Sequence, residues 1–351
     1  MPDVSADIVL IRARLLAWYD AHARSLPWRA AVGAARSEPY RVWLSEVMLQ
    51  QTTVPHATPY FHAFTTRWPS VHDLAAAEDA DVMAAWAGLG YYARARNLLA
   101  CARAVANDYA GVFPDTEPGL LALPGVGAYT AAAVAAIAFD RAANVVDGNV
   151  ERVMARLFAV ERPVPAARPE LRRLAGLFVT DERPGDWAQA LMDLGATVCR
   201  PKSPSCNACP VADQCQGLAG GDPTRFPVKA KKAERPHRHG FAYVLFDDQG
   251  RVAVQTRPDK GLLGGMLGLP TSDWTTPAPP DQPPVRGEWR TAGAVDHVFT
   301  HFSLTLTVRT AQGRAEDGPW RWMPVETARA ALPTVFAKAL DRANLEHDLF
   351  L

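Results

Sequence analysis

The 351-residue sequence has no net charge, which removes the simplest indication of a binding partner. Lysine and arginine together number 37, and aspartate and glutamate also number 37, so bulk charge does not indicate nucleic acid. Any DNA footprint must come from local basic patches and from backbone groups. Hydrophobic residues make up 48%, which supports packed cores and argues against a disordered chain. The length allows two or three domains.

Long apolar runs are also scarce. One uncharged stretch, 120–139, has the length to cross a bilayer, but a proline and two glycines break its first third. The remaining helical part, about 128–139, is too short to span and predicts a buried helix. The N-terminal apolar run is interrupted by acidic and basic residues, unlike a secretory signal. We therefore expect a cytoplasmic protein with no membrane association.

Cysteine is rare, and its distribution is uneven. An odd count of five, in a reducing compartment, disfavours a disulfide framework. Cys101 lies apart on an apolar helical pattern and is expected in the core. The other four are separated by six, two and five residues: Cys199, Cys206, Cys209 and Cys215. Four thiolates can complete a tetrahedral zinc site or an iron–sulfur cubane, and free structural thiols are the plainer alternative. Zinc sites usually pair two CxxC-like knuckles, whereas this segment has one.

The secondary-structure pattern divides the chain into two regions and a linker. Up to residue 225, alanine and leucine are abundant and strand-like alternation is scarce, which predicts a mostly α-helical region over 1–225. Glycine, proline and basic residues predict a linker over 226–238. The expected helices cover 8–22, 40–53, 55–66, 78–86, 92–109, 117–122, 128–138, 148–158, 168–179 and 186–195.

The second domain, 239–351, has the pattern of an α+β fold. The segments FAYVLFD, RVAVQTR and HFSLTLTVRT alternate or run apolar with β-branched residues, which predicts strands. The tail from Pro324 has a helical pattern. TTPAPPDQPP predicts a proline-rich surface loop.

A glycine turn followed by a helix begins at Leu123, in LPGVGAYTAAAVAAIAF. Gly125 and Gly127 permit positive φ and a close approach of the backbone. The following helix directs its free N–H groups at the turn, an arrangement suited to a phosphate. A helix–hairpin–helix of this kind contacts the DNA backbone and reads no sequence. A plain tight turn between packed helices would show the same pattern.

Two carboxylates have the surroundings of catalytic groups. Glu46 lies among apolar residues in WLSEVMLQQT, where desolvation would raise its pKa, as a group that protonates a purine requires. Asp147 lies in VVDGNVERV at a helix start, where the helix dipole stabilises an anion that could face a positive sugar. This pairing gives the split roles of glycoside cleavage. A solvated helix residue and a simple N-cap are the plainer alternatives.

Several segments together resemble a known family of DNA repair enzymes. The cysteine spacing resembles the loop that holds a [4Fe–4S] cluster in the endonuclease III and MutY families of DNA glycosylases. The strings WLSEVMLQQT, GLGYYARARNL, LPGVGAYTA, VDGNVERV and MDLGATVC resemble the MutY family over about 25–225. The resemblance implies a [4Fe–4S] cluster and hydrolysis of the N-glycosidic bond of adenine opposite 8-oxoguanine or guanine. The implied substrate is duplex DNA, the product an abasic site, and the enzyme a monomer.

The same resemblance assigns roles to the candidate site residues. Glu46 is the implied acid and base at adenine, Asp147 stabilises the sugar cation, and Tyr129 and Asn149 support them. Endonuclease III enzymes carry a lysine two residues after the second hairpin glycine. Here that residue is Tyr129, which cannot form a Schiff base, so strong β-lyase activity is not expected.

The implied DNA contacts lie on three segments of the helical region. Gln51 and Tyr91 fill the space beside the lesion when the adenine flips out of the helix. Two core aromatics at 91 and 92 are the plainer alternative for the second of these. The hairpin residues Leu123, Gly125 and Gly127 contact the backbone.

The C-terminal domain resembles the Nudix-like domain of the MutY family, which contacts 8-oxoguanine. GLLGGMLGLP, from Gly261, matches its glycine-rich loop in outline, but the run of glutamates that a Nudix hydrolase needs is missing after Pro270. We therefore expect no phosphohydrolysis. Phe299-Thr300-His301 resembles a Phe-Ser-His recognition loop, so Thr300 and His301 are implied lesion contacts, with a strand-edge pair as the alternative.

Two other functions remain open from the sequence. A bifunctional glycosylase/lyase for oxidised pyrimidines is disfavoured by Tyr129 and by the second domain. A non-enzymatic DNA-binding or redox protein could use the cluster as a sensor or carrier, but it would need no pairing of Glu46 with Asp147.

Overall fold

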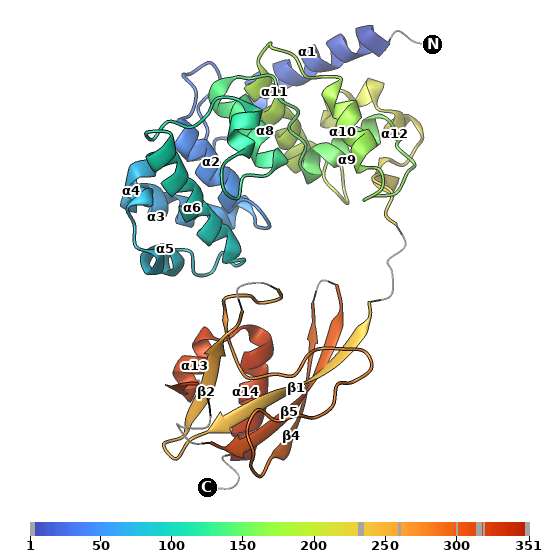
Figure 1. Ribbon diagram of the computed structural model, residues 1–351. Helices are drawn as coiled ribbons and strands as arrows, with labels where there is room; N and C mark the ends of the chain where they lie inside the picture. The colour runs from blue at the N-terminus through green and yellow to red at the C-terminus, as the bar shows by residue number, and fades with distance from the viewer. Residues whose placement is uncertain are drawn as a thin grey trace. The chain divides into compact units, whose positions relative to one another are not determined.

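The computed structural model describes residues 4–230, 235–258, 261–299, 301–313, 318 and 320–347. The chain divides into two compact units, Met1–Lys231 and Lys232–Leu351. The first unit is helical and the second is built on a β-sheet (Figure 1), and each encloses its own apolar core. The predicted fold class, a mostly helical region followed by an α+β domain, is confirmed.

The first unit is built from helices joined by turns and loops (Figure 1). The described helices are α1(Val4–His22), α2(Pro39–Met48), α3(Val54–Arg67), α4(Val71–Ala75), α5(Asp79–Ala85), α6(Ala93–Asp108), α7(Glu117–Leu121), α8(Ala128–Phe139), α9(Gly148–Leu157), α10(Arg168–Gly176), α11(Pro184–Asp193) and α12(Gln216–Ala219). Four shorter turns complete the set: the π-helical η1(Leu194–Val198) and the 3₁₀-helical η2(Cys206–Ala208), η3(Ala212–Gln214) and η4(Pro223–Arg225).

Helix α8 forms the centre of the first unit. Its residues from Thr130 to Ala138 are all buried, and most of them are alanines, so neighbouring helices can approach its backbone closely. A Cβ added to Gly185 of α11 would lie 2.6 Å from the carbonyl oxygen of Ala136, which shows how close the two helices pack. The uncharged stretch around α8 is therefore a buried helix, as predicted. No helix in the described ranges combines the length and apolar character that a bilayer crossing requires.

Two of the differences between the predicted and the observed helices have a clear local cause. The helix predicted over 40–53 ends at Met48, because Gln51 adopts a φ of 61° that an α-helix cannot contain. Helix α4 was not predicted, although its N-terminus carries a capping box. The Ser70 side chain accepts a hydrogen bond from the Asp73 amide at 3.3 Å, and the Asp73 carboxylate accepts one from the Ser70 amide at 2.9 Å.

The second unit contains a mixed sheet with helices against it (Figure 1). The strand order is β3-β2-β1-β5-β4, with β6 also paired to β2. Strands β1 and β5 are parallel, and the other pairs are antiparallel. The elements are β1(His237–Phe246), β2(Arg251–Thr256), β3(Leu267–Gly268), β4(Arg290–Val298), β5(Ser303–Gln312), β6(Arg321–Pro324), α13(Val325–Ala331) and α14(Thr334–His347). Buried Phe336 and Leu340 of α14 join the apolar face of the sheet.

The stretch expected to be a linker, 226–238, begins and ends in ordered structure. Phe226 is buried in the core of the first unit. The Val164 amide donates to the Val228 carbonyl at 2.9 Å, which holds the following residues on the first unit. At the other end, β1 begins at His237. Residues 226–228 thus lie on the first unit, and residues 237 and 238 belong to the sheet of the second.

Candidate active site and cluster loop

Glu46 projects from α2 into a buried environment. Its side chain is 6% exposed, and its Oε2 accepts a hydrogen bond from the Tyr129 hydroxyl at 2.7 Å. Burial raises the pKa of Glu46 to about 7, and the negative charge of Asp147 acts in the same direction. The Tyr129 hydrogen bond and the charge of Arg29 oppose that rise. The group can therefore hold or release a proton near neutral pH, which a solvated helix residue would not do.

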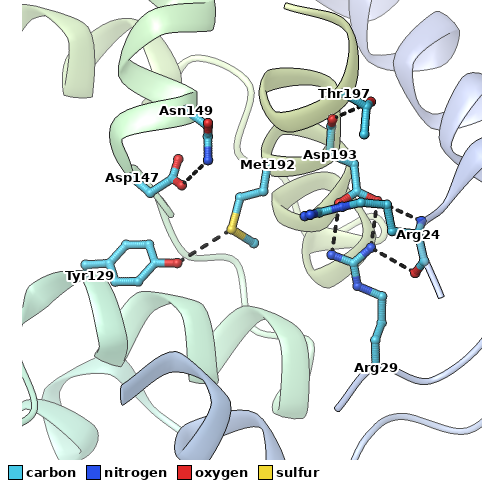
Figure 2. Close-up of polar contacts among 8 residues, drawn as sticks. All are labelled: Arg24, Arg29, Tyr129, Asp147, Asn149, Met192, Asp193 and Thr197. Atoms are coloured by element: carbon cyan, nitrogen blue, oxygen red, sulfur yellow. Dashed lines mark hydrogen bonds and ion pairs between the residues drawn. The ribbon is translucent and has the colours of Figure 1, made fainter. Parts of the chain in front are cut away.

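Tyr129 lies in the first turn of α8, facing α2 and α11. Its hydroxyl donates to Glu46. The same oxygen lies 3.5 Å from the Sδ of Met192 (Figure 2). Burial, together with the negative charges of Glu46 and Asp147, raises the pKa of the Tyr129 hydroxyl well above its usual value. The phenol therefore stays protonated and acts as a hydrogen-bond donor to the carboxyl group.

Asp147 is the N-cap of α9, which is the simpler role that the sequence left open for this residue. One carboxylate oxygen, Oδ1, accepts from the Val150 amide at 2.7 Å, and Oδ2 accepts from Asn149 Nδ2 at 2.8 Å (Figure 2). Both bonds fix the orientation of the carboxyl group. A capping role is compatible with a second role toward a substrate, because Asp147 is only half-buried.

A chain of hydrogen bonds leads from Asp147 to the cysteine loop. Asn149 donates to Asp147, and its own Oδ1 accepts from Arg152 Nη2 at 2.7 Å. Arg152 also donates to the carbonyl oxygens of Gly195 and Cys199, each at 2.8 Å. The structure thus brings Glu46, Tyr129, Asp147 and Asn149 together and links them to the segment that carries the cysteines.

The four predicted metal ligands line one small cavity. No three described cysteine, histidine, aspartate or glutamate side chains are placed so that they could hold a single metal ion. A polynuclear cluster presents several separate metal atoms, so the thiolates that bind it need not converge on a single point. The ligands come from the end of η1, from η2 and its flank, and from the start of α12: Cys199, Cys206, Cys209 and Cys215.

Arg156 supplies a buried positive charge beside that cavity. Its guanidinium is almost fully buried and donates to the carbonyls of Arg200, Pro201 and Phe226 at 2.8–3.0 Å. It also donates to Cys199 Sγ at 3.2 Å, and no described carboxylate forms an ion pair with it. A buried cation requires a compensating negative charge, and metal-bound thiolates would supply one.

In the hairpin between α7 and α8, the two glycines differ. Gly125 has a φ of 71°, and a Cβ there would lie 2.5 Å from the Cβ of Asn97. Gly127 has a φ of −91°, which any residue adopts, so only Gly125 uses the positive φ that the sequence allows for both. Leu123 is 3% exposed, so its side chain belongs to the core and only its backbone can face a partner. Gly127 offers no side-chain cap to the free N–H groups of α8, which leaves them available to an anion.

Gln51 and Tyr91 are both exposed, and both have positive φ values, of 61° and 50°. Tyr91 is 65% exposed, which excludes the core alternative for this ring. That alternative does hold for Tyr92, which packs against the core of the first unit. Two exposed side chains on strained backbone mark two loops that are held in place by their surroundings.

In the second unit, the structure describes only one of the two residues that the resemblance implies as lesion contacts. Thr300 lies outside the described residues, and His301 is exposed. Phe299, directly before them, packs against Trp274 and Phe302 at ring-centroid distances of 5.7 and 4.8 Å. The segment after Pro270 contains no helix up to Trp289, all of which the structure describes.

Sequence reasoning missed a buried ion network beside the site. Asp193, the residue after Met192, is fully buried and accepts from Arg24 Nε and Arg29 Nη1, each at 2.6 Å (Figure 2). Such a carboxylate must be paired to be stable in a core. The signal was available, because Asp193 is the only charge in AQALMDLGATV, just as Glu46 is in its segment.

Comparison with known proteins extends this geometry to a family. The model of the HhH-GPD superfamily of base excision DNA repair proteins matches residues 44–175, and that of the NUDIX domain matches 241–342. An adenine DNA glycosylase of Arabidopsis thaliana is 39% identical over 74% of this chain, and the match spans 47% of that relative. A solved thermostable thymine-DNA glycosylase is 28% identical and has a TM-score of 0.55 over 62% of this chain and 99% of its own.

One relative matches almost the whole chain, both units included. An adenine DNA glycosylase of Rattus norvegicus is 34% identical over 97% of this chain and 79% of its own length. Because this match runs through the helical unit and the sheet unit alike, the chain belongs to the adenine DNA glycosylase family, enzymes of base excision repair that remove adenine from DNA.

Proposed function

We propose that this glycosylase releases adenine paired with 8-oxoguanine, and also with guanine, from duplex DNA and leaves an abasic site. The observation that carries the proposal is the buried Glu46, whose pKa near 7 and hydrogen bond from Tyr129 suit a catalytic acid. Asp147 lies within electrostatic range of Glu46 and is held in a fixed orientation by Asn149. These features support a division of roles between an acid and an anion.

The reaction follows from the two protonation states. Protonated Glu46 donates its proton to a ring nitrogen of the flipped adenine, which makes the base a better leaving group. The N-glycosidic bond breaks, and its electron pair leaves with the adenine. Asp147, as an anion, stabilises the positive charge that develops on the sugar. Glu46, now a carboxylate, takes a proton from the water that attacks the sugar carbon, which restores the acid.

We infer that cleavage stops at the abasic site. At the start of α8, the residue that faces Glu46 is Tyr129, and its phenol carries no amine for a Schiff base. Borohydride should therefore trap no covalent adduct in high yield. An abundant trapped adduct would contradict this inference and favour a bifunctional enzyme.

The cysteine loop is proposed to hold a [4Fe–4S] cluster on Cys199, Cys206, Cys209 and Cys215. Their shared cavity and the buried charge of Arg156 support it. When bound, the cluster would supply structural stabilisation of its loop. Through the Cys199 carbonyl, that loop fixes Arg152, which in turn holds Asn149 against Asp147.

Recognition of the base opposite adenine is assigned to the second unit. Phe299 packs on Trp274 and Phe302, and the exposed His301 can donate to a lesion. We propose His301 and Thr300 as the contacts to 8-oxoguanine.

The proposed reaction is tested with a duplex that contains one A:8-oxoguanine pair. After incubation with the purified protein, alkali should cleave the strand at the adenine, and a duplex with A:G should also be cut. A duplex with C:8-oxoguanine serves as the control and should stay intact. Absence of a break at the adenine in both mispaired duplexes would contradict the proposed function.

A further inference from the structure

Arg94, near the start of α6, contacts the last turn of α2, which leads into the loop of Gln51, and the segment directly before Tyr91. Both loops have left-handed backbone at a residue with a side chain, at φ values of 61° and 50°. Such conformations persist only where surrounding contacts hold them. The contacts of Arg94 identify what holds these two.

The Arg94 guanidinium donates to four carbonyl oxygens on two separate segments. Nη1 donates to Val47 and Met48, at 3.0 and 3.3 Å, in the last turn of α2. Nη2 donates to Leu89 and Gly90, at 2.9 and 3.2 Å, directly before Tyr91. One planar group therefore fixes the distance between the end of the Glu46 helix and the Tyr91 loop.

The face of the same guanidinium supports the Tyr91 ring. The Arg94 carbon Cζ lies 5.6 Å from the centroid of Tyr91 and 5.2 Å from that of Trp86. Trp86 is fully buried, and its Nε1 donates to the Gly90 carbonyl at 3.0 Å. The orientation of Tyr91 is thereby set by buried groups, although the ring itself faces outward.

The hairpin approaches the same arginine from a third side. Arg94 and Trp43 line a cavity of about 40 Å³ together with Gln50, Asn97 and Gly125. Within it, Arg94 Nε and Trp43 Nε1 are buried, and no described residue accepts from them. A polar cavity of this size suits an ordered water molecule. Gly125 packs on Asn97, which lies one turn beyond Arg94 on α6. The hairpin turn therefore packs against the same helix that carries Arg94.

We propose that Arg94 is a positioning residue for base extrusion: it holds the Gln51 and Tyr91 loops at a fixed separation, so that both side chains enter the duplex beside the adenine. The inference rests on the proposed function, which gives those two residues that task. A lysine could not replace Arg94, because a single ammonium group lacks the planar fork that reaches both pairs of carbonyls.

The test compares Arg94→Lys with Arg103→Lys. Arg103 is a matched control, because it lies on the same helix and also bridges segments, donating to the Ala75 and Ala77 carbonyls and to Asp79 at 2.7–3.3 Å. Extrusion is followed by the fluorescence of 2-aminopurine placed opposite 8-oxoguanine, in a Glu46→Gln background. Excision is followed in single turnovers at saturating protein, across pH, with Glu46 intact.

We expect Arg94→Lys to lower extrusion and single-turnover excision by roughly tenfold or more, since small misplacements of positioning groups cost this much. The pH profile should keep its wild-type midpoint, and Arg103→Lys should stay within about twofold of wild type on both measures. Wild-type extrusion in Arg94→Lys, or a loss of excision accompanied by a shifted pH midpoint, would overturn the proposal. Failure of the proposed function is distinct, because the wild-type protein itself would then release no adenine.

A second variant keeps the proposal testable if Arg94→Lys fails to fold. Trp86→Phe keeps a buried aromatic ring, removes the N–H that donates to Gly90, and loses part of the indole volume. It should reduce extrusion in the same direction as Arg94→Lys, by a smaller factor. If Arg94→Lys does not fold and Trp86→Phe extrudes like the wild type, the proposal is wrong.

Discussion

At the scale of single residues, the proposed chemistry depends on the environment of one carboxyl group. Glu46 is surrounded by the buried residues of α2 and receives one hydrogen bond, from Tyr129. Burial disfavours the carboxylate, whereas the Tyr129 hydrogen bond favours it, and the balance raises the pKa to about 7. The acid form is therefore abundant below pH 7 and lost above it.

The rate of adenine release should fall as the pH rises above about 7, roughly tenfold per pH unit, because the fraction of protonated Glu46 falls in that proportion. Tyr129→Phe removes a hydrogen bond that lowers the pKa of Glu46, so the descending limb should move to higher pH. Tyr40→Phe is the control. Tyr40 lies on α2, the helix of Glu46, and its hydroxyl donates to the Trp68 carbonyl at 2.7 Å, away from Glu46. A profile that does not move in Tyr129→Phe would separate this hydrogen bond from catalysis.

At the scale of elements, helix α9 connects the two candidate centres. Its N-cap is Asp147, and its next turns present Arg152 and Arg156 to the cysteine loop. The position of the cysteine loop therefore affects the orientation of the Asp147 carboxylate through the hydrogen bonds of Arg152 and Asn149.

Arg152→Lys should lower adenine release by roughly tenfold or more while DNA affinity changes little, because Asn149 and then Asp147 lose their fixed orientation. Single-turnover rates and an electrophoretic binding assay measure the two effects. Arg168→Lys is the control, since Arg168 forms only an exposed ion pair with Glu151 on the neighbouring helix. Equal rates in the two variants would show that the hydrogen-bond chain has no catalytic importance.

The hairpin allows a paired test, because its two glycines are needed for different reasons. Gly125→Ala forces a side chain into left-handed backbone and against Asn97, so it should cost about 1 kcal/mol or more of stability and weaken DNA binding. Gly127→Ala meets no atom within 4 Å, so it should leave the thermal midpoint unchanged and weaken DNA binding alone. Unchanged DNA affinity in both variants would remove the hairpin from the DNA interface.

At the scale of the whole molecule, the division into a helical unit and a sheet unit could be predicted, because helical and strand periodicities occupy different parts of the sequence. Glu46 could be singled out because it is the lone charge in an apolar segment, and Asp147 because it stands at a predicted helix start. The end of α2 could not be predicted, because the Val47 and Met48 carbonyls there accept from Arg94, a residue of a later helix. Asp193 carried the same signal as Glu46, but its arginine partners lie more than 160 residues away in sequence.

The metal content tests how the first unit is assembled. The purified protein should be brown and contain iron and sulfide in the ratio of a [4Fe–4S] cluster, and loss of the metal should destabilise the loop from 199 to 215. Because α9 packs on this loop through Arg156, metal removal should also lower adenine release. A colourless, zinc-loaded protein of full activity would correct the metal assignment and leave the glycosylase mechanism in place.

The most direct test of the proposed mechanism is adenine release from an A:8-oxoguanine duplex by Glu46→Gln. The variant keeps the size of the side chain and removes the proton donor, so release should fall by roughly a hundredfold or more while the duplex is still bound. Glu38→Gln, an exposed change at the N-cap of the same helix, should release adenine at the wild-type rate. Wild-type release by Glu46→Gln would contradict the assignment of Glu46 as the catalytic acid.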